Sequence, residues 1–162
     1  MKSWLDHALH VLCVLWIGSL VTIGVIVAPT LFATVPDRML AGTLAGRFFY
    51  IESCLSLGLG LFFAAYWSRW RGALVSSNVK PRSLVYLCAA IAVLAAVQLW
   101  GLQPAIVALR EQAAALGGSV AQAPAALRRQ FGLLHGLSTL AYAIQIGLGM
   151  GLVAGLVALK RR

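Results

Sequence analysis

The sequence predicts an all-α integral membrane protein in which four transmembrane helices form an up-down antiparallel bundle. Of its 162 residues, 61% are hydrophobic and only 10% are charged, whereas about 25% are charged in a typical soluble domain. The charged residues lie mostly between or beyond four long apolar stretches. Each stretch has the roughly 20 residues that a helix needs to cross about 30 Å of hydrocarbon, and none alternates as a barrel strand does.

The four stretches are expected to form one transmembrane domain over residues 1–162. The first is longer than the roughly 7–15 apolar residues of a signal peptide. The second contains Glu52, the third carries no charge, and the fourth contains only His135. Short connections make sequential helices antiparallel neighbours. The expected helices cover roughly residues 9–33, 48–68, 84–107 and 131–159.

The distribution of basic residues predicts the orientation of the bundle. Four helices place both termini on one side, and that side holds eight of the 13 Lys and Arg residues. The positive-inside rule therefore places both termini in the cytoplasm. The net charge of +9 fits contact with the anionic head groups of a lipid bilayer. No motif that combines basic and aromatic residues indicates a nucleic-acid partner.

The outer connection over residues 108–130 is the longest one expected. It begins with the run LREQAAAL, which is composed of good helix formers. The third helix is therefore expected to continue past the membrane until Gly117 and Gly118 interrupt it.

Three polar side chains of the apolar stretches, Glu52, Gln98 and His135, share a depth near the outer face. A carboxylate in hydrocarbon costs a few kcal/mol, so Glu52 should be protonated, paired or next to a wet cavity. We expect a polar pocket with His135 as ligand or proton acceptor, Glu52 as counter-charge and Gln98 as hydrogen-bonding wall. Two alternatives stay open, namely that Glu52 pairs with an arginine at the interface and that His135 is an ordinary interfacial histidine.

Small residues in the fourth stretch indicate a helix-packing face. Gly147, Gly151 and Gly155 are four residues apart, and such a Gly-x-x-x-Gly series lets helix backbones approach closely in lipid. This face would mediate either a homodimer or membrane-protein partner contact, or packing within one bundle. The three cysteines all lie in apolar stretches, where they are expected to serve as small packing residues.

No catalytic motif stands out, which favours a protein that is not an enzyme. The sequence contains no Gly-rich phosphate loop, no Gly-x-Ser-x-Gly and no His-Glu-x-x-His. Its four acidic residues leave little room for paired-carboxylate chemistry. Near the amino terminus, His7 and His10 beside Asp6 would suit a transition metal, or would form a solvated helix start. No metal ligand or cofactor is therefore assigned from the residues.

Three segments together resemble a known family. They read WIGSLVTIGVIVAPTLFATVP over residues 16–36, AGTLAGRFFY over residues 41–50, and LLHGLS over residues 133–138. The combination resembles the transmembrane protein 205-like family, whose bacterial members carry a domain of unknown function. The resemblance implies a small four-helix protein of the bacterial inner membrane with no established activity. The residues that carry it are Trp16, Gly18, Pro29, Phe32, Gly42, Gly46, His135, Gly136 and Ser138.

The family is also distantly similar to the copper-resistance D proteins and to the J-type protoporphyrinogen oxidases, which implies haem or copper as an alternative cofactor. A second histidine opposite His135 is missing from the apolar stretches, which counts against a bis-histidine haem site. The leading hypothesis is a binding, transport or accessory role centred on the outer polar pocket. The alternatives are a haem- or copper-binding redox or assembly protein, and a structural partner of another membrane complex.

Overall fold

The computed structural model describes residues 2–69 and 81–160, and within these ranges every regular element is a helix. Four helical rods are long and apolar enough to cross a membrane, which confirms the predicted fold class and makes the chain a multi-pass membrane protein. The middle of the basic connection over residues 69–82 lies outside the described residues. The four spans are His7–Thr34, Arg38–Arg69, Arg82–Ala115 and Ala125–Ala158.

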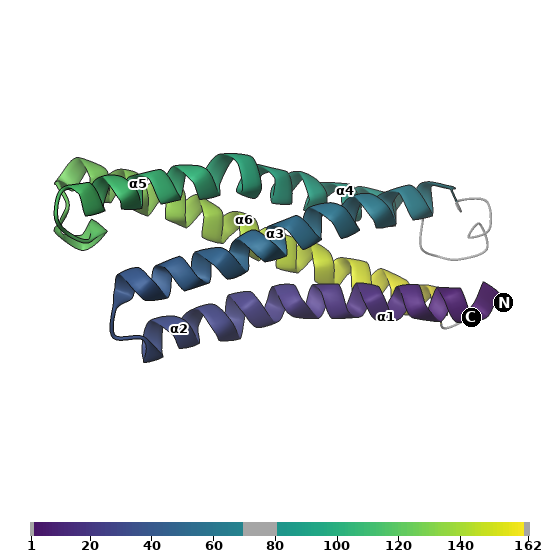
Figure 1. Ribbon diagram of the computed structural model, residues 1–162. Coiled ribbons are helices and arrows are strands. Elements are labelled where there is room, and N and C mark those ends of the chain that lie inside the picture. Colours follow the sequence, from purple (N-terminus) through teal and green to yellow (C-terminus); the bar gives the residue numbers. More distant parts are fainter. Residues whose placement is uncertain (1, 70–80, 161–162) are drawn as a thin grey trace.

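The rods run antiparallel, so that α1 begins and α6 ends at the same end of the bundle (Figure 1). We call this the terminal end, and we call the opposite end, with the turns at residues 35–37 and 116–124, the loop end. The first rod consists of α1 (Lys2–Val21), η1 (Thr22–Val27) and α2 (Ala28–Thr34), and the second is α3 (Arg38–Arg69). The third consists of α4 (Pro81–Val97), η3 (Gln98–Leu102) and α5 (Gln103–Ala115). The 3-10 turn η4 (Val120–Gln122) leads to the fourth rod, α6 (Ala125–Lys160).

All four rods are longer than the expected ranges, and the second, third and fourth gain most of their extra length at the loop end, where both turns are short. Asp37 starts α3 by accepting the backbone N–H of Met39 at 2.8 Å and that of Leu40 at 3.3 Å. Gly117 ends α5 with a φ of 80°, a left-handed conformation that glycine adopts without strain. Helical structure therefore replaces most of the two connections expected at this end.

The first and third rods each contain a π-helical turn, and a proline explains both. Pro29 is the second residue of α2, directly after η1, and Pro104 is the second residue of α5, directly after η3. Proline has no backbone N–H, and its ring clashes with the carbonyl four residues earlier, which here lies in the π turn. A wider turn relieves that clash and bends the rod.

The half of the bundle near the terminal end contains the tightly packed core. Trp16, Phe63 and Trp67 form a stack with centroid distances of 6.0 and 5.1 Å. At Gly60, an added Cβ would lie 3.0 Å from the Cβ of Ala92, so only glycine allows α3 and α4 to approach this closely. Cys13 and Cys88 are buried in this core as packing residues, whereas Cys54 is exposed.

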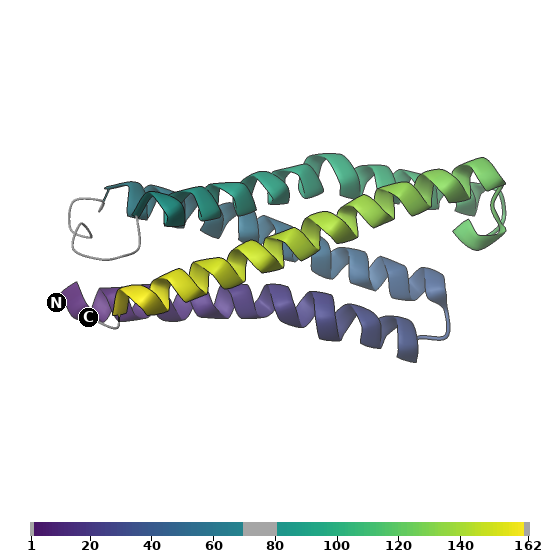
Figure 2. The same ribbon diagram turned by 180° about the vertical axis from the view of Figure 1, so that it is seen from behind.

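The half near the loop end is built differently. There α2 packs on α3 and α5 packs on α6, and the two pairs spread apart (Figure 1). Seen from behind, α6 crosses the bundle obliquely, from α5 at the loop end to α1 at the terminal end (Figure 2). The spreading leaves the space in which the candidate site lies.

Candidate functional site

A cavity of about 1080 Å³ lies between the two spread helix pairs. This is slightly larger than the roughly 300–1,000 Å³ of typical small-molecule sites, and its lining is mainly apolar as in such sites. At 1.5 Å per residue, the lining stretch of α6 from His135 to Ile146 is roughly 16 Å long. That length is close to half of the about 30 Å hydrocarbon core, or one leaflet of a membrane.

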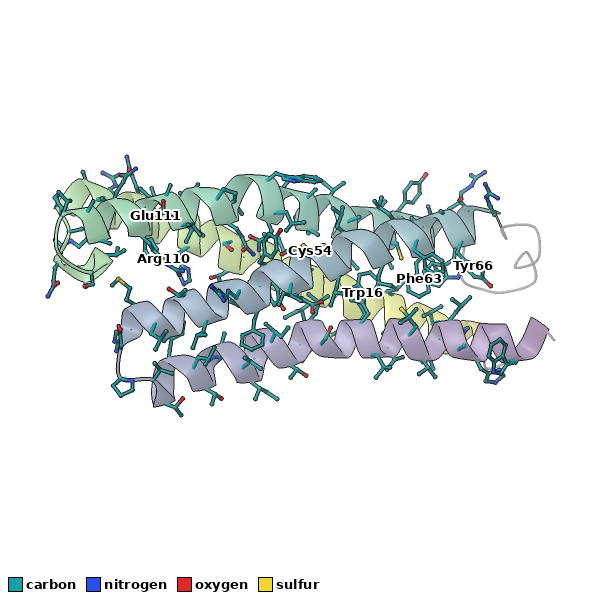
Figure 3. The ribbon with its side chains drawn as sticks, viewed as in Figure 1. Trp16, Cys54, Phe63, Tyr66, Arg110 and Glu111 are labelled. Atoms are coloured by element: carbon teal, nitrogen blue, oxygen red, sulfur yellow. The ribbon has the colours of Figure 1, made fainter. Side chains whose placement is uncertain are left out.

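Arg110 is the main polar feature of this cavity, and it enters from α5. Its side chain reaches into the space between α5 and α3 (Figure 3). The Nη1 group donates a hydrogen bond of 2.9 Å to the carbonyl of Gly42. A Cβ added at Gly42 would lie 3.3 Å from Nη2, and one at Gly46 would lie 3.4 Å from Nη1. The guanidinium group therefore lies against the backbone of α3 at Gly42 and Gly46, which are one helical turn apart. We call these two residues the glycine seat.

Arg110 also contacts α6, where it forms a cluster with Phe131 and His135. The Arg110 Cζ lies 5.7 Å from the centre of the Phe131 ring, a cation–π distance. The His135 ring stacks on the same ring, at a centroid distance of 5.7 Å and an interplanar angle of 9°. We call these three residues the Arg110–Phe131–His135 cluster.

Glu52 lies outside the cavity lining and belongs to a buried hydrogen-bonded chain between α1 and α3. The Ser19 hydroxyl donates to Oε2 at 3.0 Å, and the Ser56 hydroxyl points to Oε1 at 3.4 Å. Ser56 in turn accepts the Trp16 indole N–H at 3.0 Å. The described residues thus satisfy Glu52 with two serines, and neither an arginine nor His135 bonds to it. The position of this chain indicates that it fixes α1 against α3.

Gln98 is also buried outside the cavity lining, and it joins η3 to α6. Its Nε2 donates to the Ser138 carbonyl at 2.9 Å, and the Ser138 hydroxyl donates to its Oε1 at 2.8 Å. A second buried amide, Gln145, donates to the Ile91 carbonyl at 3.2 Å and was not singled out from the sequence. The three residues of the expected polar pocket therefore do not share one site, since His135 lines the cavity and Glu52 and Gln98 do not.

A family model described as a domain of unknown function (DUF4149) matches residues 11–115. The chain belongs to this family. The match in the DUF4149 chain includes Trp16, the glycine seat and Arg110, and it ends before α6, which carries His135 and Ser138. No curated protein and no solved structure matches the chain. The similarity to transmembrane protein 205-like proteins stays a prediction.

The other residues of the resemblance take different positions in the DUF4149 chain. Phe32 lines the cavity and Pro29 follows the π turn η1, as described above. Gly18 and Gly136 are exposed, and an added Cβ at either would meet no atom within 4 Å. Neither glycine is therefore required by a close contact within the monomer.

The expected glycine face of α6 is largely unpacked within the monomer. At Gly147 and Gly151, an added Cβ would meet no atom within 4 Å, and Gly155 is half-buried. The close approach of α6 to α1 occurs instead at Gly149, where an added Cβ would lie 2.7 Å from the Ile17 side chain. Gly147 and Gly151 are thus available for a contact outside the bundle.

The part of the chain that the structure describes contains no cluster of side chains that could hold a metal ion. Among the side chains that the structure describes, which exclude that of Asp6, no three His, Cys, Asp or Glu gather as a metal site requires. His7 is exposed, and the side chain of Asp6 lies outside the described residues. In the Arg110–Phe131–His135 cluster a single imidazole lies beside a cation, a surrounding that does not fit haem or copper.

Arg110 is the main residue of the candidate site that the sequence analysis did not single out. It lies three residues beyond the expected end of the third helix and was assigned to the outer connection. A signal was present in the sequence, since AGTLAGR offers two glycines four residues apart and LREQAAAL continues the helix with an arginine. Together these features are consistent with the contact of the Arg110 side chain with Gly42 and Gly46.

Proposed function

We propose that the DUF4149 chain is a membrane-embedded binding protein that holds a small, mainly apolar molecule taken from the bilayer, in a carrier or accessory role. The observation that carries this proposal is the cavity of about 1080 Å³ within the membrane-spanning part of the bundle. A cavity of this size with an apolar lining and a few polar groups has the general character of a ligand site.

Access from the membrane supports this proposal. Several apolar residues of the lining are exposed although they lie in membrane-spanning segments, among them Val25 at 61%, Ile51 at 55% and Val107 at 47%. In a bilayer these exposed surfaces meet lipid chains. A molecule dissolved in the membrane would therefore enter the cavity without crossing water.

In this proposal the protein lies in a bacterial inner membrane with both termini in the cytoplasm. The bias of eight basic residues against five supports that orientation. The loop end then faces outward, and the cavity opens to the outer leaflet. Fusion of a reporter enzyme to either terminus would test the orientation, with activity expected only from a reporter that works in the cytoplasm.

Photolabelling with a long-chain diazirine alcohol in lipid vesicles tests the binding function. We expect the label to concentrate on peptides of α3, α5 and α6 that line the cavity. Ala143→Phe places a large ring on a lining residue of α6 and should abolish this labelling. Ala154→Phe makes the same change on an exposed residue of α6 outside the lining and should leave it intact.

A different labelling pattern would count against a binding cavity. Label spread evenly over the lipid-facing surface would show only general contact with the bilayer. Equal loss of label in both phenylalanine variants would point to a disturbance of α6 rather than to a filled cavity.

A second candidate function is that of a structural partner in a membrane complex, and the open face at Gly147 and Gly151 favours it. Gly151→Leu should then abolish co-purification of the partner or of a second copy, because the leucine keeps the backbones apart. Gly136→Leu makes the same change at another open glycine of α6 and should have no effect. Retained association of Gly151→Leu would exclude this face as the interface.

A further inference from the structure

We propose that the ligand of the cavity is a single-chain amphiphile with an acidic head, either a carboxylate or a phosphate monoester. The head binds at Arg110, and the chain extends along α6 toward Tyr142 and Ile146. This inference rests on the proposed function and names the ligand class for the same cavity.

The hydrogen-bonding capacity of Arg110 is the first support. A guanidinium group has five N–H donors. The described residues offer Arg110 one hydrogen-bond acceptor, the carbonyl of Gly42, together with the Phe131 ring, and they place no carboxylate against it. A cation in a membrane-spanning segment is costly when its donors have no acceptors. Carboxylate and phosphate groups satisfy a guanidinium with two parallel hydrogen bonds.

The fixed position of Arg110 is the second support. The Gly42 carbonyl and the glycine seat hold one edge of the guanidinium, while Phe131 lies within cation–π distance. The side chain is half-buried and also lines the cavity. A guanidinium held in this way loses little further freedom when it binds an anion, and such preorganisation favours affinity. His135 lines the same part of the cavity, where its imidazole can form a further hydrogen bond to the head.

The distribution of charge along the cavity is the third support. Its charged lining residues are Arg47, Arg110 and Glu111, two positive and one negative, and they belong to the loop-end half of α3 and the second half of α5. This balance favours a negative head over a positive one. The deeper end is lined by Leu99 and Ile146.

The dimensions and the chemistry of the deep end support a single apolar chain. Three hydroxyls of α6 line the inner part of the cavity, those of Ser138, Thr139 and Tyr142, and each already donates a hydrogen bond within the protein, Tyr142 to the Leu20 carbonyl at 3.0 Å. These hydroxyls therefore offer no free donor to a second polar group. The lining of α6 is roughly 16 Å long, which suits the chain of a lipid from one leaflet.

Binding of four probes to the purified protein in a nonionic detergent tests this inference. The probes are hexadecyl phosphate, palmitate, hexadecanol and inorganic phosphate, each measured by native mass spectrometry and by displacement of a fluorescent fatty acid. We expect hexadecyl phosphate and palmitate to bind about tenfold or more tightly than hexadecanol, because hydrogen bonds to a charged group are strong. Inorganic phosphate alone should not displace the fluorescent probe.

Substitution of Arg110 gives the decisive comparison. Arg110→Gln keeps a donor for the Gly42 carbonyl but loses the charge, so the preference for acidic heads should disappear while hexadecanol binds as before. Arg110→Lys keeps the charge and should retain part of the preference. Arg129→Gln removes the same charge from an exposed position outside the cavity lining and should change nothing. A melting curve for each variant distinguishes a lost ligand from a lost fold.

The outcomes separate this inference from the function on which it rests. Equal affinity for all three long-chain probes would overturn the acidic head and leave the binding cavity in place. Failure of every long-chain probe to bind would overturn both. Displacement by inorganic phosphate as strong as that by hexadecyl phosphate would show a simple anion site, and the amphiphile would be rejected.

Discussion

The two halves of the bundle use glycine for opposite purposes. Near the terminal end, Gly60 and Gly149 let neighbouring helices pack in close contact. Near the loop end, Gly42 and Gly46 face a guanidinium group rather than another helix, and the helix pairs beside them spread apart. The comparison teaches that small residues in a membrane helix mark a close approach, while the approaching group is either a neighbouring helix with its apolar side chains or a single polar side chain.

The aromatic stack should give the largest effect on stability. Phe63→Ala removes a fully buried ring from the stack with Trp16 and Trp67, and it should lower the free energy of unfolding by about 3 kcal/mol. Denaturant titration in mild detergent measures this loss. Phe62→Ala, at a ring that is 48% exposed, should cost much less. Similar losses for both variants would mean that the terminal half is not the rigid part of the molecule.

The Glu52 chain lies between the two halves and should give the next largest effect. Glu52→Ala leaves the buried Ser56 hydroxyl without its acceptor, whereas Ser19 keeps the Trp16 carbonyl at 2.7 Å, and the change should cost about 2 kcal/mol of unfolding free energy. Glu52→Gln keeps an acceptor and should cost clearly less in the same titration. If the glutamine variant were as unstable as the alanine variant, the carboxyl group would have a role beyond these two hydrogen bonds.

The amide bridge of Gln98 should have a smaller effect. Gln98→Leu removes both hydrogen bonds to Ser138, but the serine hydroxyl can turn to a carbonyl of its own helix, so the cost should be about 1 kcal/mol. Gln103→Leu, at a half-buried residue of the cavity lining, serves as the matched control. A larger loss for the control than for Gln98→Leu would reverse the assigned roles of the two amides.

Filling the cavity should have the smallest effect on stability. Ala143 is exposed on the lining, so the ring of Ala143→Phe enters open space and should change the unfolding free energy by no more than about 0.5 kcal/mol. The same variant should lose photolabelling, as described above. A strongly destabilised variant would indicate that the loop half is as tightly packed as the terminal half.

The local sequence pattern was sufficient to predict the helices. Charged residues are costly in hydrocarbon, so they lie mainly in the connections and mark where the membrane spans begin and end. It was insufficient for the site, because depth along a helix does not fix the direction of a side chain. Glu52, Gln98 and His135 were expected to share a depth in the membrane, yet only His135 lines the cavity. Arg110 was missed because the expected continuation of the third helix was placed beyond the membrane, and the helix pattern does not show that this basic residue faces the cavity.

The length of α6 also has a consequence for the membrane around the protein. Its 36 residues make a rod of roughly 54 Å, whereas a bilayer with its head groups is about 40–45 Å thick. α6 runs obliquely to the other rods (Figure 2), and tilt of this kind would fit a long helix into a thinner bilayer. Because Leu152 and Leu156 anchor its last turns in the core, a change in tilt moves the wall near His135 most. Bilayer thickness therefore bears directly on the width of the cavity.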